Sequence, residues 1–125
     1  MSADRNIRIE VETDYLEAES TPDEDRYVFA YTITIHNDGP CAARLVGRYW
    51  RIVDGNGEIH EMEGEGVVGE QPCLQPGTGF RYTSGTQVET PMATMRGHYR
   101  MIDAYGERFE AAIPEFLLTT PRVLH

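Results

Sequence analysis

The chain has 125 residues and a formal net charge of −10, because 21 carboxylates are set against 11 arginines and lysine is absent. A strongly acidic protein is repelled by a phosphate backbone, which disfavours general nucleic-acid binding. The length is sufficient for one hydrophobic core, so we expect a single domain over residues 1–125. No apolar run reaches the length of a signal-peptide core or of a membrane span, which predicts a cytoplasmic protein without membrane contact.

Along the chain, apolar residues recur with a period of two, as expected for β-strands that bury one face. The clearest run is Tyr27, Phe29, Tyr31, Ile33 and Ile35. The same alternation predicts strands from residue 7 to 11 or 15, and at 45–53, 59–62, 80–84, 95–101 and 109–113, with 116–118 as a further short strand. Turn residues separate these runs, and no window carries a helical stripe. Seven to eight short strands predict an all-β fold, an antiparallel β-sandwich, with a small barrel as the alternative.

The stretch EGEGVVGEQP contains Gly64, Gly66 and Gly69 in the order G-x-G-x-x-G. A dinucleotide site needs a helix directly behind such glycines, and Pro72 would break that helix. Neighbouring carboxylates also oppose a pyrophosphate. We therefore expect a bulged loop that crosses between the sheets. The alternative is a ligand loop at Gly64, Gly66, Gly69 and Gln71 that binds pyrophosphate nucleotides or divalent cations, although a small-molecule nucleotide is the less favoured partner.

Acidic residues raise two metal hypotheses. Glu61, Glu63 and Glu65 recur at period two and form a weak candidate for a hard-cation site, or else a charged edge that discourages strand pairing. The segment from Asp54 to Glu65 resembles a calcium-binding loop in ligand spacing, but Ile59 occupies its glycine position, and a hairpin turn is favoured.

Catalytic and cofactor patterns are weak. The histidines and cysteines lack the spacing of a zinc site, and Ser84 lacks the first glycine of a G-x-S-x-G elbow. The sequence therefore predicts no cofactor and a protein that is not an enzyme.

The segment RLVGRYWRIVDG is rich in aromatic and cationic residues. On a strand, Arg48 and Trp50 share one face while Tyr49 and Arg51 share the other, and Trp50 is predicted to anchor the core. Arginine and tyrosine are enriched at interface centres. The candidate surface for an unidentified protein partner consists of Arg48, Tyr49, Arg51, Phe116 and Leu118, the last two from the apolar C-terminal segment.

A longer pattern of tryptophan, glycine, proline and aromatic positions extends from Arg48 to Leu118. Its members are Arg48, Trp50, Ile52, Asp54, Gly55, Gly57, Gly64, Gly66, Val67, Val68, Gly69, Gln71, Pro72, Leu74, Pro76, Gly77, Phe80, Tyr82, Thr83, Ser84, Gly85, Thr90, Pro91, Met95, Gly97, Tyr99, Gly106, Phe109, Ile113, Pro114, Phe116 and Leu118. This pattern resembles that of the ApaG family over nearly the whole chain. Tyr49 stands where histidine is expected, and Ala93 where glycine is usual.

The resemblance implies an immunoglobulin-like or fibronectin type III-like sandwich in a small bacterial cytosolic protein. It also implies a link to cobalt tolerance and magnesium efflux, and a gene often placed beside that of a dinucleoside tetraphosphate hydrolase. Related domains occur in eukaryotic F-box proteins and in a polymerase-interacting protein, which implies a non-enzymatic protein–protein interaction module. The family supplies no established catalytic residue.

Overall fold

The computed structural model describes residues 6–121. Within this range the chain forms eight β-strands and two short 3₁₀ helices. The elements are β1 (Ile7–Tyr15), η1 (Glu17–Glu19), η2 (Pro22–Glu24), β2 (Tyr27–Asn37), β3 (Ala43–Asp54), β4 (Ile59–Glu65), β5 (Cys73–Leu74), β6 (Gly79–Val88), β7 (Met92–Asp103) and β8 (Arg108–Thr119). None of the helices in this range is long and apolar enough to span a lipid bilayer.

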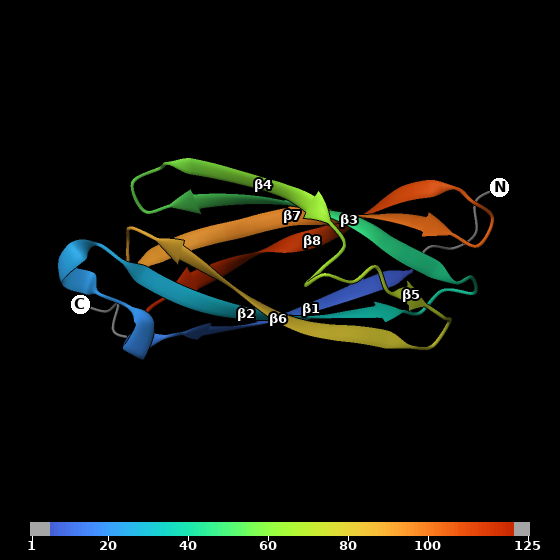
Figure 1. The fold of residues 1–125 in the computed structure, drawn as a ribbon, viewed down its shortest axis with the longest axis horizontal. Coiled ribbons are helices and arrows are strands. Elements are labelled where there is room, and N and C mark those ends of the chain that lie inside the picture. The colour runs from blue at the N-terminus through green and yellow to red at the C-terminus, as the bar shows by residue number, and fades with distance from the viewer. Residues whose placement is uncertain (1–5, 122–125) are drawn as a thin grey trace.

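The strands form two antiparallel sheets that lie face to face (Figure 1). The three-stranded sheet has the order β1-β2-β6. The five-stranded sheet has the order β4-β3-β7-β8, and the short β5 pairs with β3 beyond the end of β4. The predicted antiparallel β-sandwich is therefore confirmed.

Strand boundaries differ from the sequence prediction at the C-terminal end. The pattern predicts two strands separated near Pro114, whereas β8 is continuous from Arg108 to Thr119. Proline cannot donate to a β-ladder and is tolerated on edge strands and at bulges. Both conditions hold here, because β8 is an edge strand and its pairing with β7 shifts register between Met95 and Gly97. The two-residue β5 was not predicted, since it is too short to show a period.

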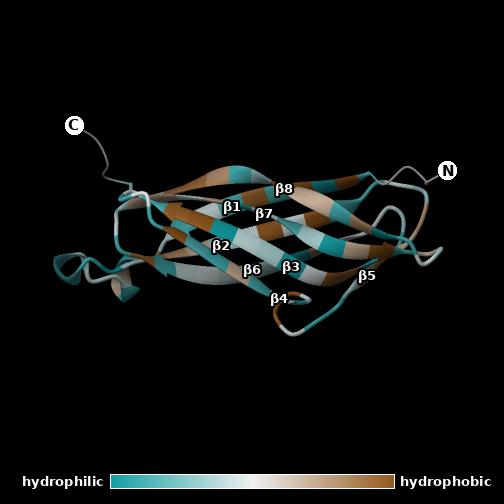
Figure 2. Cartoon of the chain, turned by 90° about the horizontal axis from the view of Figure 1, so that it is seen from above, coloured by the Kyte–Doolittle hydropathy of each residue, from teal (hydrophilic) through white to brown (hydrophobic). Residues whose placement is uncertain are grey.

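Trp50 is the largest side chain in the core, with 1% of its surface exposed, as the sequence predicts. Its ring meets Tyr31 edge-on at a centroid distance of 5.3 Å and Phe116 at 5.9 Å. These three aromatic residues come from β3, β2 and β8, so the contacts join the two sheets. Hydrophobic and hydrophilic residues alternate along the strands, which gives each sheet one apolar face (Figure 2).

Gly97 on β7 lies opposite Trp50 on β3 in the β-ladder. A Cβ atom at position 97 would lie 1.9 Å from the carbonyl oxygen of Tyr49 and 3.2 Å from Trp50 Cα. Backbone atoms of a central strand cannot move aside without breaking the ladder. The close approach of β7 to β3 beneath Trp50 therefore requires glycine.

We expect Gly97→Ala to lower the free energy of unfolding by about 3 kcal/mol or more, because the added methyl group collides with backbone. Gly85→Ala on β6 is the matched control, since its Cβ would lie 3.3 Å from the nearest atom, the Phe29 carbonyl oxygen. Urea denaturation of both variants measures the difference. Equal losses in the two proteins would contradict the steric explanation.

Candidate functional site

The glycine-rich loop follows the edge of the five-stranded sheet. Gly64 still belongs to β4, and Gly66 leaves it with a φ of 62°. Val68 and Gly69 then form a tight turn in which both φ angles are positive, 43° and 82°. Such a pair is typical of a type I′ hairpin turn, and β5 follows without any helix. The predicted crossing between sheets is wrong, because β4 and β5 both pair with β3 (Figure 2).

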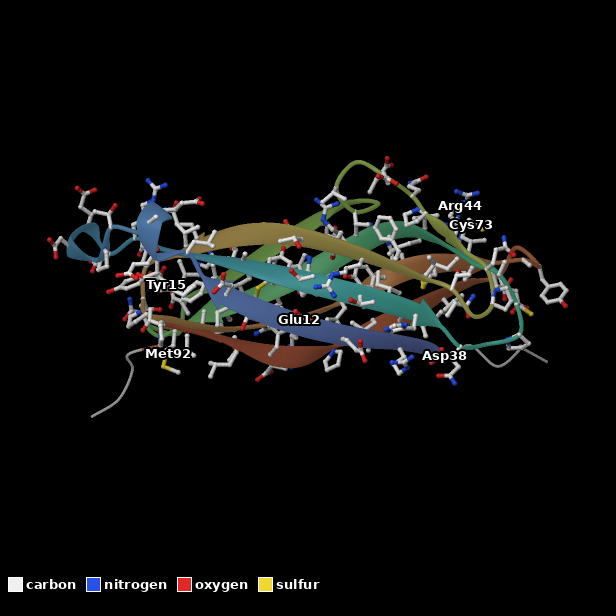
Figure 3. The ribbon with its side chains drawn as sticks, turned by 90° about the horizontal axis from the view of Figure 1, so that it is seen from below. Glu12, Tyr15, Asp38, Arg44, Cys73 and Met92 are labelled. Carbon is white, nitrogen blue, oxygen red and sulfur yellow. The ribbon has the colours of Figure 1, made fainter. Side chains whose placement is uncertain are left out.

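Arginine side chains hold this loop by its carbonyl oxygens. Arg48 Nη1 donates to the carbonyl oxygens of Glu65 at 3.1 Å and Gly66 at 2.9 Å. Arg44 Nη1 donates to the Gln71 carbonyl at 2.7 Å. Arg44 lies beside Cys73 of the facing β5 in the sheet (Figure 3). Backbone carbonyls of the loop are thus directed at cations of the protein itself.

Three N–H groups of the loop are also engaged. Gly66 N–H donates to the Val46 carbonyl at 3.0 Å, and the N–H groups of Val67 and Glu70 donate to each other's carbonyls at 2.8 and 2.9 Å. An anion nest needs several N–H groups that converge on one point. This arrangement disfavours the pyrophosphate interpretation of Gly64, Gly66 and Gly69, as the sequence argument does.

Arg48 lies on the inward face of β3 and does not contribute to an outer surface with Tyr49. Three tyrosines of the interior lie close enough for its guanidinium to favour their ionised forms: Tyr31, Tyr82 and Tyr99. Tyr82 Oη and Tyr99 Oη share a hydrogen bond of 2.5 Å. Burial is the stronger effect and raises all three pKa values, that of Tyr82 to about 12.

Tyr49 and Arg51 lie on the outer face of the five-stranded sheet, as the alternation predicts. The Tyr49 ring stacks on His98 of β7 at a centroid distance of 5.2 Å. Its hydroxyl donates to the Glu61 carboxylate, and this hydrogen bond is the main cause of the raised pKa of Tyr49. Arg51 lies directly opposite Arg96 in the ladder between β3 and β7. We call Tyr49, Arg51, Arg96 and His98 the arginine–tyrosine face.

Two predicted surface residues belong to the core instead. Leu118 is fully buried, and Phe116 packs against Tyr31 and Trp50. The apolar C-terminal segment is part of β8, so its inward residues fill the sandwich. Arg96 and His98 were not among the predicted site residues. The alternation along residues 95–101 places both outward, but only the pairing of β7 with β3 brings them beside Arg51 and Tyr49.

The three glutamates at period two do not converge on one point. Glu61 accepts the Tyr49 hydroxyl and Glu63 Oε2 lies 3.7 Å from Arg100, and among the described residues these three carboxylates form no ligand group. Residues 54–58 form a hairpin turn, as favoured over the calcium-loop interpretation.

These observations define an all-β sandwich domain with an aromatic and cationic outer face on its five-stranded sheet and a glycine-rich loop along one edge. The model of the ApaG domain matches residues 17–103, and the chain belongs to this family. It is 57% identical to the ApaG protein of Azoarcus sp. strain BH72 over 127 residues that cover 100% of both chains. It is 51% identical to that of Proteus mirabilis strain HI4320, again over 100% of both. A crystal structure from Bordetella pertussis described as an ApaA protein superposes with a TM-score of 0.92, at 44% identity over 95% of this chain and 97% of that one.

The buried tyrosines predict a loss of stability in alkali. A raised pKa in the folded state means that folding opposes ionisation of the tyrosine. The contribution of the neutral tyrosine to the free energy of unfolding is therefore complete below the unfolded pKa of 10.0. For Tyr82 it is lost as the pH rises through about 12. We expect the free energy of unfolding to fall by about 1.4 kcal/mol per pH unit for each such tyrosine above about pH 10. Urea denaturation between pH 8 and 12 measures the slope, and Tyr82→Phe should make it shallower. An unchanged slope in that variant would contradict the assignment.

Proposed function

We propose that the domain is a non-enzymatic protein-binding module whose contact surface is the arginine–tyrosine face. Aromatic residues and arginine are enriched at the centres of protein interfaces, where they become desolvated. Tyr49 and His98 form a stacked aromatic pair there, with Arg51 and Arg96 beside it. The resemblance to the ApaG family implies a protein-interaction module, which supports the same protein-binding function.

The observation that carries the proposal is the facing pair of arginines. Like charges directly opposite each other destabilise a sheet. Among residues 6–121, neither Arg51 nor Arg96 has a carboxylate within salt-bridge distance. Glu61 is the partner of Arg51 in the β3–β4 ladder, but it accepts the Tyr49 hydroxyl instead. Carboxylates of a partner protein would supply the missing countercharge.

The outer face of the three-stranded sheet is different. Arg8 pairs with Asp38 at 2.8 Å and with Glu10 at 3.0 Å, and Arg81 Nη1 lies 3.5 Å from Glu12. Glu12 lies midway along β1 on this face, and Asp38 lies at one end of it (Figure 3). The arginines of this face therefore have carboxylate partners within the chain. This face is the control surface against which the arginine–tyrosine face is compared.

The proposal includes the fibronectin type III-like arrangement. The order β1-β2-β6 facing β4-β3-β7-β8 corresponds to sheets A-B-E and C′-C-F-G of sandwich domains of this type. The link to cobalt tolerance and magnesium efflux stays a prediction of the resemblance.

The test uses a photocrosslinking amino acid at position 49 to capture partners from the native cytosol, followed by calorimetry with each purified partner. Charge reversal by Arg96→Glu should weaken binding by about tenfold or more, because a desolvated charge pair is replaced by repulsion. Arg81→Glu is the matched control, since it reverses an exposed arginine on the opposite sheet. We expect Arg81→Glu to bind like the unmodified protein.

Two results would overturn the proposal. Arg96→Glu, shown to be folded by its thermal unfolding, could bind as tightly as the unmodified protein. Alternatively, Arg81→Glu could weaken binding equally, which would assign the effect to net charge.

The alternative ligand loop makes a separate prediction. Because loop carbonyls accept from arginines and the N–H groups of Gly66, Val67 and Glu70 are bonded within the protein, we expect no response of residues 64–71 to ATP or diadenosine tetraphosphate at millimolar concentration. Amide chemical shifts measured during the titration decide. Saturable shifts confined to the loop would favour the nucleotide-binding alternative.

A further inference from the structure

The two hairpins of the five-stranded sheet have the same turn. The sequences are Asp54-Gly-Asn-Gly-Glu58 and Asp103-Ala-Tyr-Gly-Glu107. In each turn the first aspartate Oδ1 accepts two backbone N–H groups, at 2.9 and 3.0 Å, from the residues two and four positions later. In each turn the glycine has a positive φ, 82° at Gly57 and 85° at Gly106. The turn itself therefore explains the contacts of Oδ1 in both aspartates and the Asp-x-x-Gly-Glu pattern that the two turns share.

The first hairpin carries one additional group. His60 lies six residues after Asp54, and Phe109 occupies the equivalent position after Asp103. The ladder places His60 opposite Ile52 and Phe109 opposite Met101, in matching register. His60 Nε2 lies 3.9 Å from Asp54 Oδ2 and 3.9 Å from Glu58 Oε1. The turn motif requires no imidazole at this position, as the second hairpin shows.

Asp54 has an unsatisfied oxygen that is directed into this group. The exposed fraction of its side chain is 0%, and Oδ2 is buried without a hydrogen-bond partner among the described residues. A buried carboxylate oxygen without a partner is costly, because it has lost its water. The side chains of Glu58 and His60 are 60% and 54% exposed, so both are free to move over it.

We propose that Asp54, Glu58 and His60 form a binding site for a divalent transition-metal ion of the zinc class. Their three ligand atoms lie within 4.8 Å of one another. One imidazole nitrogen with two carboxylate oxygens suits zinc and its first-row neighbours, whereas calcium and magnesium select oxygen ligands alone. The ion supplies the countercharge that Asp54 Oδ2 lacks, and water completes its coordination.

The distances require only a small closure. Metal–ligand bonds of about 2.0–2.2 Å place two ligands of a tetrahedral ion about 3.3–3.6 Å apart. The distances of 3.9 Å from His60 Nε2 to its two neighbours exceed this separation only slightly. A rotation of the exposed Glu58 side chain is sufficient to complete the set. The site lies at the end of β3 and does not depend on the arginine–tyrosine face or on the protein-binding function proposed for it.

The experiment titrates Zn²⁺ into the full chain without a polyhistidine tag, and calorimetry and amide chemical shifts record binding. We expect one saturable site, with the largest shifts at residues 54–60, and a rise in the unfolding temperature because the ion binds the folded state. Mg²⁺ and Ca²⁺ should bind at least about tenfold more weakly than Zn²⁺.

Two variants remove ligands and preserve the hairpin. His60→Phe copies the residue of the second hairpin, and Asp54→Asn retains an Oδ1 acceptor for the turn but removes the carboxylate. Each should weaken Zn²⁺ binding by about tenfold or more. His36→Phe is the control, because His36 Nε2 also lies beside a carboxylate, Glu10 Oε1, at 3.1 Å. We expect that control to bind like the unmodified protein.

The proposal is overturned if no saturable shift occurs at residues 54–60, since His60 would then serve only as an ion-pair partner of Asp54. It is also overturned if His60→Phe and Asp54→Asn bind Zn²⁺ as tightly as the unmodified protein. Tighter binding of Ca²⁺ than of Zn²⁺ would refute the assigned class of metal.

Discussion

The inward position of Trp50 is the constraint on which the rest of the structure depends. Its ring fills the space between the sheets, and the strand period of two then fixes the direction of its neighbours on β3 from Arg48 to Asp54. Arg48 and Asp54 must face inward with it, whereas Tyr49 and Arg51 must face solvent. The orientation of one strand therefore determines three features together. Arg48 reaches the glycine-rich loop, the Asp54 carboxylate is buried in its turn, and the outer face carries Tyr49 and Arg51.

The glycine-rich loop illustrates how one local pattern supports two unrelated structures. In a dinucleotide site, glycines bring N–H groups to a phosphate at the start of a helix. Here Gly66 and Gly69 supply positive φ angles to an edge loop, and the adjacent arginines bind its carbonyl oxygens. The roles are reversed relative to a dinucleotide site, because here the loop backbone accepts hydrogen bonds from arginines of the protein and does not donate them to a phosphate. In an acidic chain, this arrangement also keeps Arg44 and Arg48 close to partial negative charges.

Both proposed sites contain charged groups that have no partner of opposite charge or no hydrogen-bond donor within the described residues. At the arginine–tyrosine face, Arg51 and Arg96 lack carboxylate partners among the described residues, and at the first hairpin Asp54 Oδ2 lacks a donor. Uncompensated charges of this kind reduce stability and persist where another molecule supplies the compensation. On the outer face of the three-stranded sheet, by contrast, Arg8 and Arg81 lie beside carboxylates of the chain itself.

Strand existence, the hairpin turns and the burial of Trp50 follow from the sequence by itself, because alternation and turn chemistry act over a few neighbouring residues. Only the tertiary structure decided which strands pair, and pairing brings Arg96 and His98 beside Tyr49 and Arg51. It also turned Leu118 from a surface candidate into a core residue. A period of two separates two sets of side chains, but it does not state which set faces the other sheet at a chain end or which residue lies across the ladder. Those choices depend on contacts between residues distant in sequence.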